Sequence, residues 1–202
     1  MKGVAISCIK GGTGKTTISH ALALGAAWHN TPGYLCHTDN RDPISTINRP
    51  YKYYDARDSK HLEFLMGKAL TREGLFIIDG GGNREKLDYW IASCVDLVVI
   101  PITPDPEDVK EGIRYADLMY KAGAKKVVYL INKYPSNVFE REYVEKYIEQ
   151  LPIESIIGKV NNVNSLKILR ESDSEDFKTP NTKVNNFCRS VYRLINGCLL
   201  HE

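Results

Sequence analysis

The residues from Lys10 to Thr17 carry the clearest chemistry in the sequence. They read Lys-Gly-Gly-Thr-Gly-Lys-Thr-Thr, after a short apolar run and before a helix-forming segment. Glycines let a backbone curl so that several N–H groups point at phosphate oxygens, and the following helix adds the partial positive charge of its N-terminus. Lys15 would then meet the β- and γ-phosphates, and the Thr16 hydroxyl would ligate Mg²⁺. A tight turn alone explains neither side chain, so the segment predicts a phosphate-binding loop (P-loop).

The lysine directly before the first glycine makes this loop a special form of the motif. The pattern K-G-G-x-G-K-T-T resembles the deviant Walker A motif of the ParA/MinD family of partition, division-site and related positioning ATPases, and the resemblance to its small ParA-like partition members covers nearly the whole chain. In that family the first lysine reaches the phosphates bound by the other subunit of a dimer. The resemblance therefore implies that Lys10 acts in trans, as an arginine finger does. The expected nucleotide contacts in the loop are Gly11, Gly12, Thr13, Gly14, Lys15, Thr16 and Thr17.

A second set of polar residues follows the second apolar run. Residues 38–43 read Thr-Asp-Asn-Arg-Asp-Pro, where the family has D-x-D-P-Q. The family's aspartate before the proline helps to orient the attacking water, which implies this catalytic role for Asp42. Asp39 stays the alternative, because two residues instead of one separate it from Asp42 and because Ile44 replaces the glutamine.

Two more site residues end apolar runs. Phe76–Asp79 has the Walker B pattern, in which a carboxylate at a strand end beside a P-loop holds Mg²⁺ directly or through water. The glycines at 80–82 could register the γ-phosphate. Asn132 lies where family members place an asparagine that contacts adenine, and Pro135 stands where a guanine-reading N-K-x-D loop has its aspartate. ATP and Mg²⁺ are therefore the expected cofactors.

Alternating strand and helix patterns supply the elements that must position these residues. The strand candidates are continuously apolar, which is typical of parallel strands buried on both faces: Val4–Ile9, Tyr34–Thr38, Leu75–Ile78, Leu97–Ile102, Val127–Ile131 and Ile153–Ile157. The clearest helix covers Pro106–Lys121, with Asp105 as its capping carboxylate. The alternation predicts an α/β P-loop NTPase fold, a mostly parallel twisted sheet flanked by helices on both faces.

Length and composition favour one domain over residues 1–202. Residues 171–182 are polar and predict an exposed loop, and a helix at about 183–199 has an apolar stripe that would dock onto the domain. The five cysteines form no C-x-x-C pair, which argues against a metal cluster and suits a reducing cytosol. The N-terminal apolar run is too short for a signal peptide, and no run reaches the ~18 apolar residues of a membrane span. We expect a cytoplasmic protein.

The function implied by the resemblance is a ParA-like ATPase. It would bind Mg·ATP, form a homodimer, hydrolyse ATP slowly without a partner, and position DNA or another cargo through nonspecific DNA binding and a small ParB-like adaptor. The net charge of +2 is too mild to indicate DNA binding by itself. Basic residues available for a local patch are Lys121, Lys125, Lys126, Lys183, Arg189 and Arg193.

Two alternatives use the same scaffold. A MinD-like ATPase that cycles on membranes would need a free amphipathic C-terminal helix with a basic face, whereas this helix has a core-like apolar stripe and no lysine cluster. Membrane binding is therefore not expected. A biosynthetic ATP-dependent enzyme would need a substrate pocket, and a metal-cluster carrier would need paired cysteines.

Overall fold

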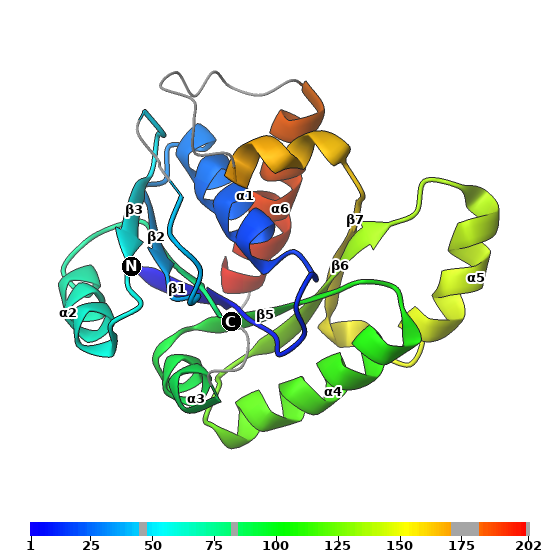
Figure 1. Ribbon diagram of the computed structural model, residues 1–202, viewed down its shortest axis with the longest axis horizontal. Helices are drawn as coiled ribbons and strands as arrows, with labels where there is room; N and C mark the ends of the chain where they lie inside the picture. Colours follow the sequence, from blue (N-terminus) through cyan, green and yellow to red (C-terminus); the bar gives the residue numbers. More distant parts are fainter. Residues whose placement is uncertain (45–47, 82–84, 171–181, 201–202) are drawn as a thin grey trace.

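A computed structural model describes residues 1–44, 48–81, 85–170 and 182–200 (Figure 1). Over these residues, seven strands form one entirely parallel sheet in the order β3-β2-β4-β1-β5-β6-β7. The strands are β1 (Lys2–Ile6), β2 (Gly33–His37), β3 (Lys52–Asp55), β4 (Leu75–Asp79), β5 (Leu97–Ile102), β6 (Val127–Tyr134) and β7 (Ile156–Asn161). The helices are α1 (Lys15–Trp28), α2 (Ser59–Ala69), α3 (Glu85–Cys94), α4 (Pro106–Lys121), α5 (Val138–Ile148) and α6 (Thr182–Leu200), with short 3-10 helices η1 (Ile153–Ser155) and η2 (Asn164–Arg170).

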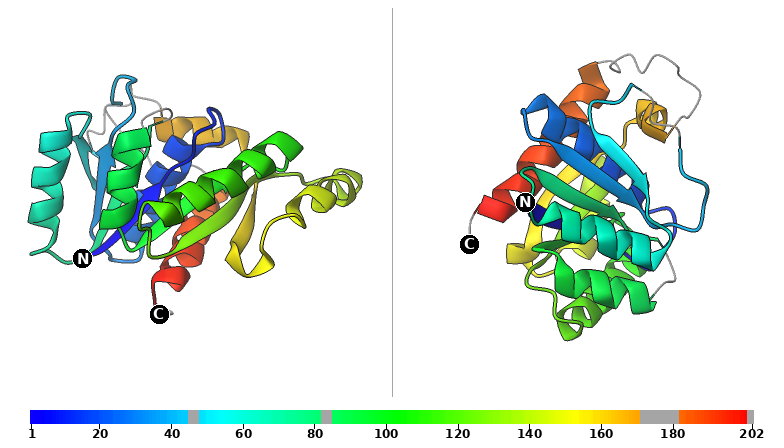
Figure 2. Two further views of the ribbon diagram at one scale, coloured as in Figure 1. Left: turned by 90° about the horizontal axis from the view of Figure 1, so that it is seen from below. Right: turned by 90° about the vertical axis from the view of Figure 1, so that its left-hand side faces the viewer.

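Helices cover both faces of the sheet, which confirms the predicted fold class (Figure 2). One face carries α1, α6 and η2, and the other carries α2, α3 and α4, while α5 lies at the β6–β7 end. Each face has its own apolar core, because the buried strands present side chains to both sides.

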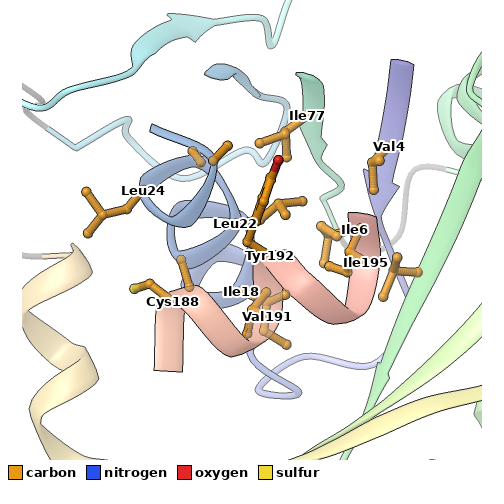
Figure 3. Packing of buried hydrophobic residues seen from close by; sticks show 14 of the residues in the cluster. Val4, Ile6, Ile18, Leu22, Leu24, Ile77, Cys188, Val191, Tyr192 and Ile195 are labelled. Atoms are coloured by element: carbon orange, nitrogen blue, oxygen red, sulfur yellow. The ribbon is translucent and has the colours of Figure 1, made fainter. Parts of the chain in front are cut away.

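The closest helix–helix approach on the first face is between α1 and α6. Buried side chains from Ile18, Leu22, Val191 and Ile195 meet there above the sheet (Figure 3). A Cβ atom on Gly25 of α1 would lie 2.3 Å from the carbonyl oxygen of Cys188. Glycine at this position therefore lets the two backbones touch.

The strand order places the P-loop at a turning point of the topology. β1 lies between β4 and β5, and the chain passes from β1 to one side of the sheet before it returns to β5 on the other. Ligands of open parallel sheets bind at the carboxyl ends of the strands at such a point. The register sets Asp79 of β4 beside Ile6 of β1 and beside His37 of β2. These two pairings bring a carboxylate and an imidazole to the edge from which the P-loop starts.

Some predicted strand bounds differ from the structure, such as the end of β6, which runs to Tyr134 instead of Ile131. β1 ends at Ile6 instead of Ile9, because Ser7–Ile9 already lead into the loop. The predicted strand at Ile153–Ile157 begins with η1, where Ile153 is 84% exposed, and β7 runs on to Asn161. β3 was not predicted, because this edge strand has only half-buried tyrosines between two exposed polar ends.

The helix predicted at Pro106–Lys121 has those bounds, and Asp105 caps it. α6 begins at Thr182 and buries the apolar stripe of the C-terminal segment. Gly82 and residues 171–181 lie outside the described residues, so the predictions for them stay predictions. None of the helices in the described ranges has both the length and the apolar content needed to cross a membrane.

Candidate nucleotide-binding site

The P-loop connects β1 to α1 and depends on glycine at two left-handed positions. Gly12 has φ 82° and Gly14 has φ 99°, a region that other residues enter only with strain. A Cβ atom on Gly14 would also lie 2.3 Å from Nδ2 of Asn132. Gly14 precedes α1 without a side-chain cap, so the backbone N–H groups of the first helical turn are left for a ligand. An anion is the ligand that such a helix start binds best.

Lys15 is buried at the first position of α1. Its ammonium donates to the carbonyl oxygen of Lys10 at 2.9 Å and lies 3.6 Å from Sγ of Cys8. Burial raises the pKa of the Cys8 thiol, and the nearby Lys15 offsets this only in part, so the thiol stays neutral beside the lysine. The buried Thr13 hydroxyl contacts the same sulfur at 3.0 Å. The Lys15 side chain thus lies along the loop, with its ammonium against the Lys10 carbonyl and the Cys8 thiol.

Lys10 contacts acidic residues of its own chain. Its ammonium forms an ion pair with Asp108 and another with Glu107 at 2.9 Å, both on the first turn of α4, and lies 4.0 Å from the capping residue Asp105. The hydrogen bonds to Asp108 and Glu107 raise the pKa of Lys10 above its ordinary value. In this single chain the predicted trans-acting lysine is therefore held at the start of α4.

Asp79 ends β4 as a fully buried carboxylate. Its Oδ1 accepts a hydrogen bond from Ser19 of α1 at 3.2 Å, whereas its Oδ2 accepts none from the residues described. A buried carboxylate oxygen in this state needs a cation or a donor. Asp79 thus fits a Mg²⁺ ion or its water shell, and Thr16, half-buried on the first turn of α1, is the other predicted ligand.

His37 faces this carboxylate and was missed by the sequence analysis. Its Nδ1 lies 3.7 Å from Oδ2 of Asp79, and its Nε2 lies 2.9 Å from the carbonyl oxygen of Arg41. Burial by itself lowers the pKa of His37, but the Asp79 carboxylate and the Arg41 carbonyl outweigh it, so the pKa is raised. The only signal in the sequence was a polar residue at the end of an apolar strand. That β2 pairs with β4 was not readable from the chain.

The two candidate water-positioning aspartates lie on the loop after β2 in different surroundings. Asp39 accepts a hydrogen bond from the backbone N–H of Arg41 at 3.2 Å. The side chain of Asp42 is fully exposed, 3.4 Å from Nη1 of Arg57, which also pairs with Asp55 at 2.7 Å. Within the described residues, neither aspartate has a hydrogen bond or ion pair to the P-loop. The choice between them stays open.

Asn132, near the end of β6, contacts the backbone of the P-loop. Its Nδ2 donates to the carbonyl oxygen of Thr13 at 2.7 Å, and the ammonium of Lys133 donates to the carbonyl oxygen of Gly12 at 2.8 Å. A pocket of about 300 Å³ opens beside Gly14 and is lined by Thr17, Asn132, Asn161, Asn162, Asn164, Lys167 and Arg170 among others. The segment 161–170 was not predicted as part of the site, because its only signal in the sequence was three asparagines in four residues.

Some of the basic residues predicted for DNA contact interact with other residues of the same chain. Lys125 pairs with Asp96 at 3.1 Å, and Lys126 donates to the carbonyl oxygen of Cys198 at 2.8 Å. The guanidinium of Arg189 lies 5.9 Å from the ring centre of Trp28. Lys121, Lys183 and Arg193 are exposed.

Several proteins of known structure share the overall fold of this chain. No protein-family model and no curated protein sequence matches the chain. Its structure is similar to that of the cell division protein MinD from Aquifex aeolicus, with 17% identity, a TM-score of 0.73 and 98% of both chains covered. A protein of Borrelia burgdorferi B31 assigned to plasmid partition and bound to AMPPNP has 16% identity and a TM-score of 0.69 over 98% of both chains. MinD from Pyrococcus horikoshii OT3, complexed with Mg-ADP, has 12% identity and a TM-score of 0.69 over 98% of this chain and 97% of that one. The chain therefore has the fold of the ParA/MinD-type ATPases, and the resemblance noted in its sequence is confirmed at the level of the fold.

Proposed function

We propose that this chain is a Mg²⁺-dependent ATPase of the ParA type, which dimerises on ATP and hydrolyses it to position a cargo. The observation that supports this most directly is the P-loop at the turning point of the sheet, with Lys15 in the loop and Asp79 on the neighbouring strand. Several nucleotide-bound proteins share this fold.

ATP would bind through groups that the structure already presents. The N–H groups of the P-loop and of the first turn of α1 would bind the phosphates. Lys15 would exchange its hydrogen bond with the Lys10 carbonyl for one with the β- and γ-phosphates. Thr16 and Asp79 would hold Mg²⁺, which neutralises phosphate charge when bound. The pocket beside Gly14 would take the base and sugar, with Asn132 at the adenine.

Slow hydrolysis by the single chain follows from the position of Lys10. Its ammonium is paired with Asp108 and Glu107 of its own α4. The charge that would stabilise the transition state must therefore come from the Lys10 of a second copy, after that lysine has left its acidic partners. Asp42, or Asp39 in its place, would orient the attacking water.

Calorimetry with ATP, ADP and GTP, each with and without Mg²⁺, tests the proposed nucleotide site. We expect Mg²⁺-dependent ATP binding that is lost in Lys15→Ala. Equal affinity for ATP and GTP would remove the adenine assignment, and the absence of ATP binding would refute the proposed activity. Light scattering with a non-hydrolysable ATP analogue, with ADP and without nucleotide should show a dimer only in the first sample.

The burial and charge of α6 favour duplex DNA over a membrane as the surface to which the protein binds. The apolar stripe of α6 is buried against α1 through Val191 and Ile195, so it is not free to enter a lipid surface. Arg189 and Arg193 on the same helix are exposed, and a dimer doubles this pair. We therefore propose that the ATP-bound dimer binds duplex DNA without sequence preference and that a small ParB-like adaptor stimulates its turnover.

A DNA shift assay and vesicle co-sedimentation, run side by side with a non-hydrolysable ATP analogue, separate the two surfaces. Log affinity for DNA should fall by roughly 0.9 per phosphate contact per log unit of salt. Arg189→Ala with Arg193→Ala should lower both the affinity and this slope, whereas Lys60→Ala with Lys68→Ala on α2 serves as the charge-matched control. Vesicle binding without DNA binding would support the membrane alternative, and the absence of both would support a protein cargo or a biosynthetic role.

A further inference from the structure

An aromatic pocket lies between α2 and the edge strands of the sheet, away from the P-loop. Tyr34 and Phe76 pair with each other in the sheet, each as the second residue of its strand, so both side chains lie on the same face. Tyr54 of β3 pairs with Cys36, two residues after Tyr34, and therefore lies on that face as well. A pocket of about 210 Å³ is lined by these three aromatic residues and by α2, which stands at the β3 end of the sheet (Figure 1).

Phe64 of α2 lines this pocket while much of its surface stays in solvent. It is 59% exposed, whereas the next two residues of α2, Leu65 and Met66, pack against the apolar core of this face. A single exposed apolar residue is common on protein surfaces, but this one borders a pocket that three further aromatic residues line. Aromatic side chains in such a setting often dominate the binding energy of a protein interface.

Two cations border the pocket, and each lies over one of its rings. The ammonium of Lys68 is 5.1 Å from the ring centre of Phe64, and the guanidinium of Arg72 is 5.9 Å from that of Tyr34. Both cationic side chains are exposed, and over the described parts of the chain neither forms an ion pair with a carboxylate. Lys60 lies one helical turn before Phe64 on the same face of α2. The pocket is therefore apolar inside and positively charged at its rim.

These properties define the chemistry of an occupant. A cavity of about 150 Å³ can bind benzene, so this pocket has room for one aromatic ring. Carboxylates beside that ring would form charge-assisted hydrogen bonds with Lys68 and Arg72. A nucleic acid fits less well, because its backbone carries a charge at every phosphate, and the exposed Glu63 and Glu73 directly adjoin Phe64 and Arg72 in the chain.

We propose that this pocket is a docking site for an acidic segment of a partner protein. An aromatic side chain of the segment enters the pocket beside Phe64, and its neighbouring carboxylates pair with Lys68 and Arg72. The site lies near the amino ends of β2 and β4, whereas the P-loop lies at the carboxyl edge of the sheet, so docking does not depend on the proposed nucleotide site.

Nuclear magnetic resonance of the full chain, titrated with short synthetic peptides, tests this site. The probe has one tryptophan between two runs of glutamate. One control peptide has alanine in place of the tryptophan, and the other has lysines in place of the glutamates. The probe should cause saturable shifts in the signals of Tyr34, Tyr54 and Phe64, and each control should bind about tenfold more weakly. Added salt should weaken binding of the probe, because the ion pairs lie at the surface.

Substitutions at the pocket should reproduce these differences. Phe64→Ala, and Lys68→Gln combined with Arg72→Gln, should each weaken binding of the probe about tenfold. Leu70→Ala and Lys110→Gln are the matched controls, because Leu70 is 84% exposed, Lys110 is exposed on α4, and neither lines the pocket. All these side chains are exposed, so we expect the variants to fold.

Three results would overturn the proposal. The first is the absence of shifts at Tyr34, Tyr54 and Phe64 when the probe is added to the unaltered chain, or equal binding of the lysine peptide. The second is stronger binding of a single-stranded oligonucleotide than of the probe at the same signals, which would assign the pocket to nucleic acid. The third is a shift of these signals with protein concentration alone, which would assign the pocket to a second copy of the chain.

Discussion

The ammonium of Lys10 contacts the carboxylate of Asp108, a buried residue on the first turn of α4 in the same chain. Glu107 is a second partner at 2.9 Å. In the proposed mechanism Lys10 serves the phosphates of a second copy, so dimer formation must exchange these acidic partners for phosphate oxygens. The exchange is possible because the Lys10 ammonium would move from carboxylate oxygens to phosphate oxygens, which are also negatively charged. The Lys10 side chain is also partly exposed.

Substitution of the two loop lysines should separate assembly from nucleotide binding. Lys10→Ala should keep ATP affinity within a few-fold but lose ATP-dependent dimerisation and turnover. Among the described residues, the Lys10 ammonium pairs with acidic side chains at the start of α4, away from the first turn of α1 that would bind the phosphates. Lys15→Ala should lose ATP binding itself. Calorimetry measures the first property and light scattering the second. A Lys10→Ala chain that dimerises and turns over normally would show that Lys10 does not act across subunits.

Replacement of the loop aspartates should identify the residue that positions water. Asp42→Ala should trap the ATP-bound dimer, because the groups that bind ATP remain while the attacking water loses its anchor. Phosphate release and light scattering with ATP provide the readout. Normal turnover in Asp42→Ala would transfer the role to Asp39, which is bonded to the Arg41 N–H. Normal turnover in both single variants would remove the role from this loop.

Alanine at two P-loop glycines should have unequal effects on stability. Gly14 has φ 99°, and its Cβ would meet Nδ2 of Asn132 at 2.3 Å, whereas Gly11 has open space and no positive φ. Gly14→Ala should lower the free energy of unfolding by about 1–2 kcal/mol or more, the cost of a left-handed conformation with a Cβ. Gly11→Ala should be near neutral. Chemical denaturation of both variants measures the difference, and equal values would contradict the backbone argument.

Alanine at two helical glycines should change stability in opposite directions. The Cβ of Gly25→Ala would lie 2.3 Å from the Cys188 carbonyl and 2.8 Å from Cβ of Tyr192, so α1 and α6 must separate. We expect a loss of about 1–3 kcal/mol, as for other overpacked cores. Apart from the backbone of α2 itself and the two chain neighbours, no atom of the described residues lies within 4 Å of such a Cβ on Gly67, so Gly67→Ala should gain about 0.5–1 kcal/mol. A stable Gly25→Ala chain would contradict the close approach of the two helices.

The sequence by itself determined the features that local pattern controls. The P-loop is recognisable because glycine spacing, one lysine and a following helix are contiguous in the chain. Buried parallel strands show as apolar runs, and α4 shows as a capped amphipathic helix with the bounds that were predicted. Strand ends were less well predicted, and the polar edge strand β3 was missed, because a half-buried edge has no continuous apolar run.

Only the tertiary structure decided which polar groups meet. The pairing of β2 and β4 sets His37 against Asp79, and the Thr38 hydroxyl donates to the Asp79 carbonyl oxygen from 41 residues away in the sequence. Asn132 reaches the Thr13 carbonyl from 119 residues away, and Lys10 finds its acidic partners at the start of α4. Such contacts depend on strand order and on the register at the carboxyl edge of the sheet. Strand order follows from how both helix layers bury their apolar faces, and that is a property of the whole chain and not of any single segment.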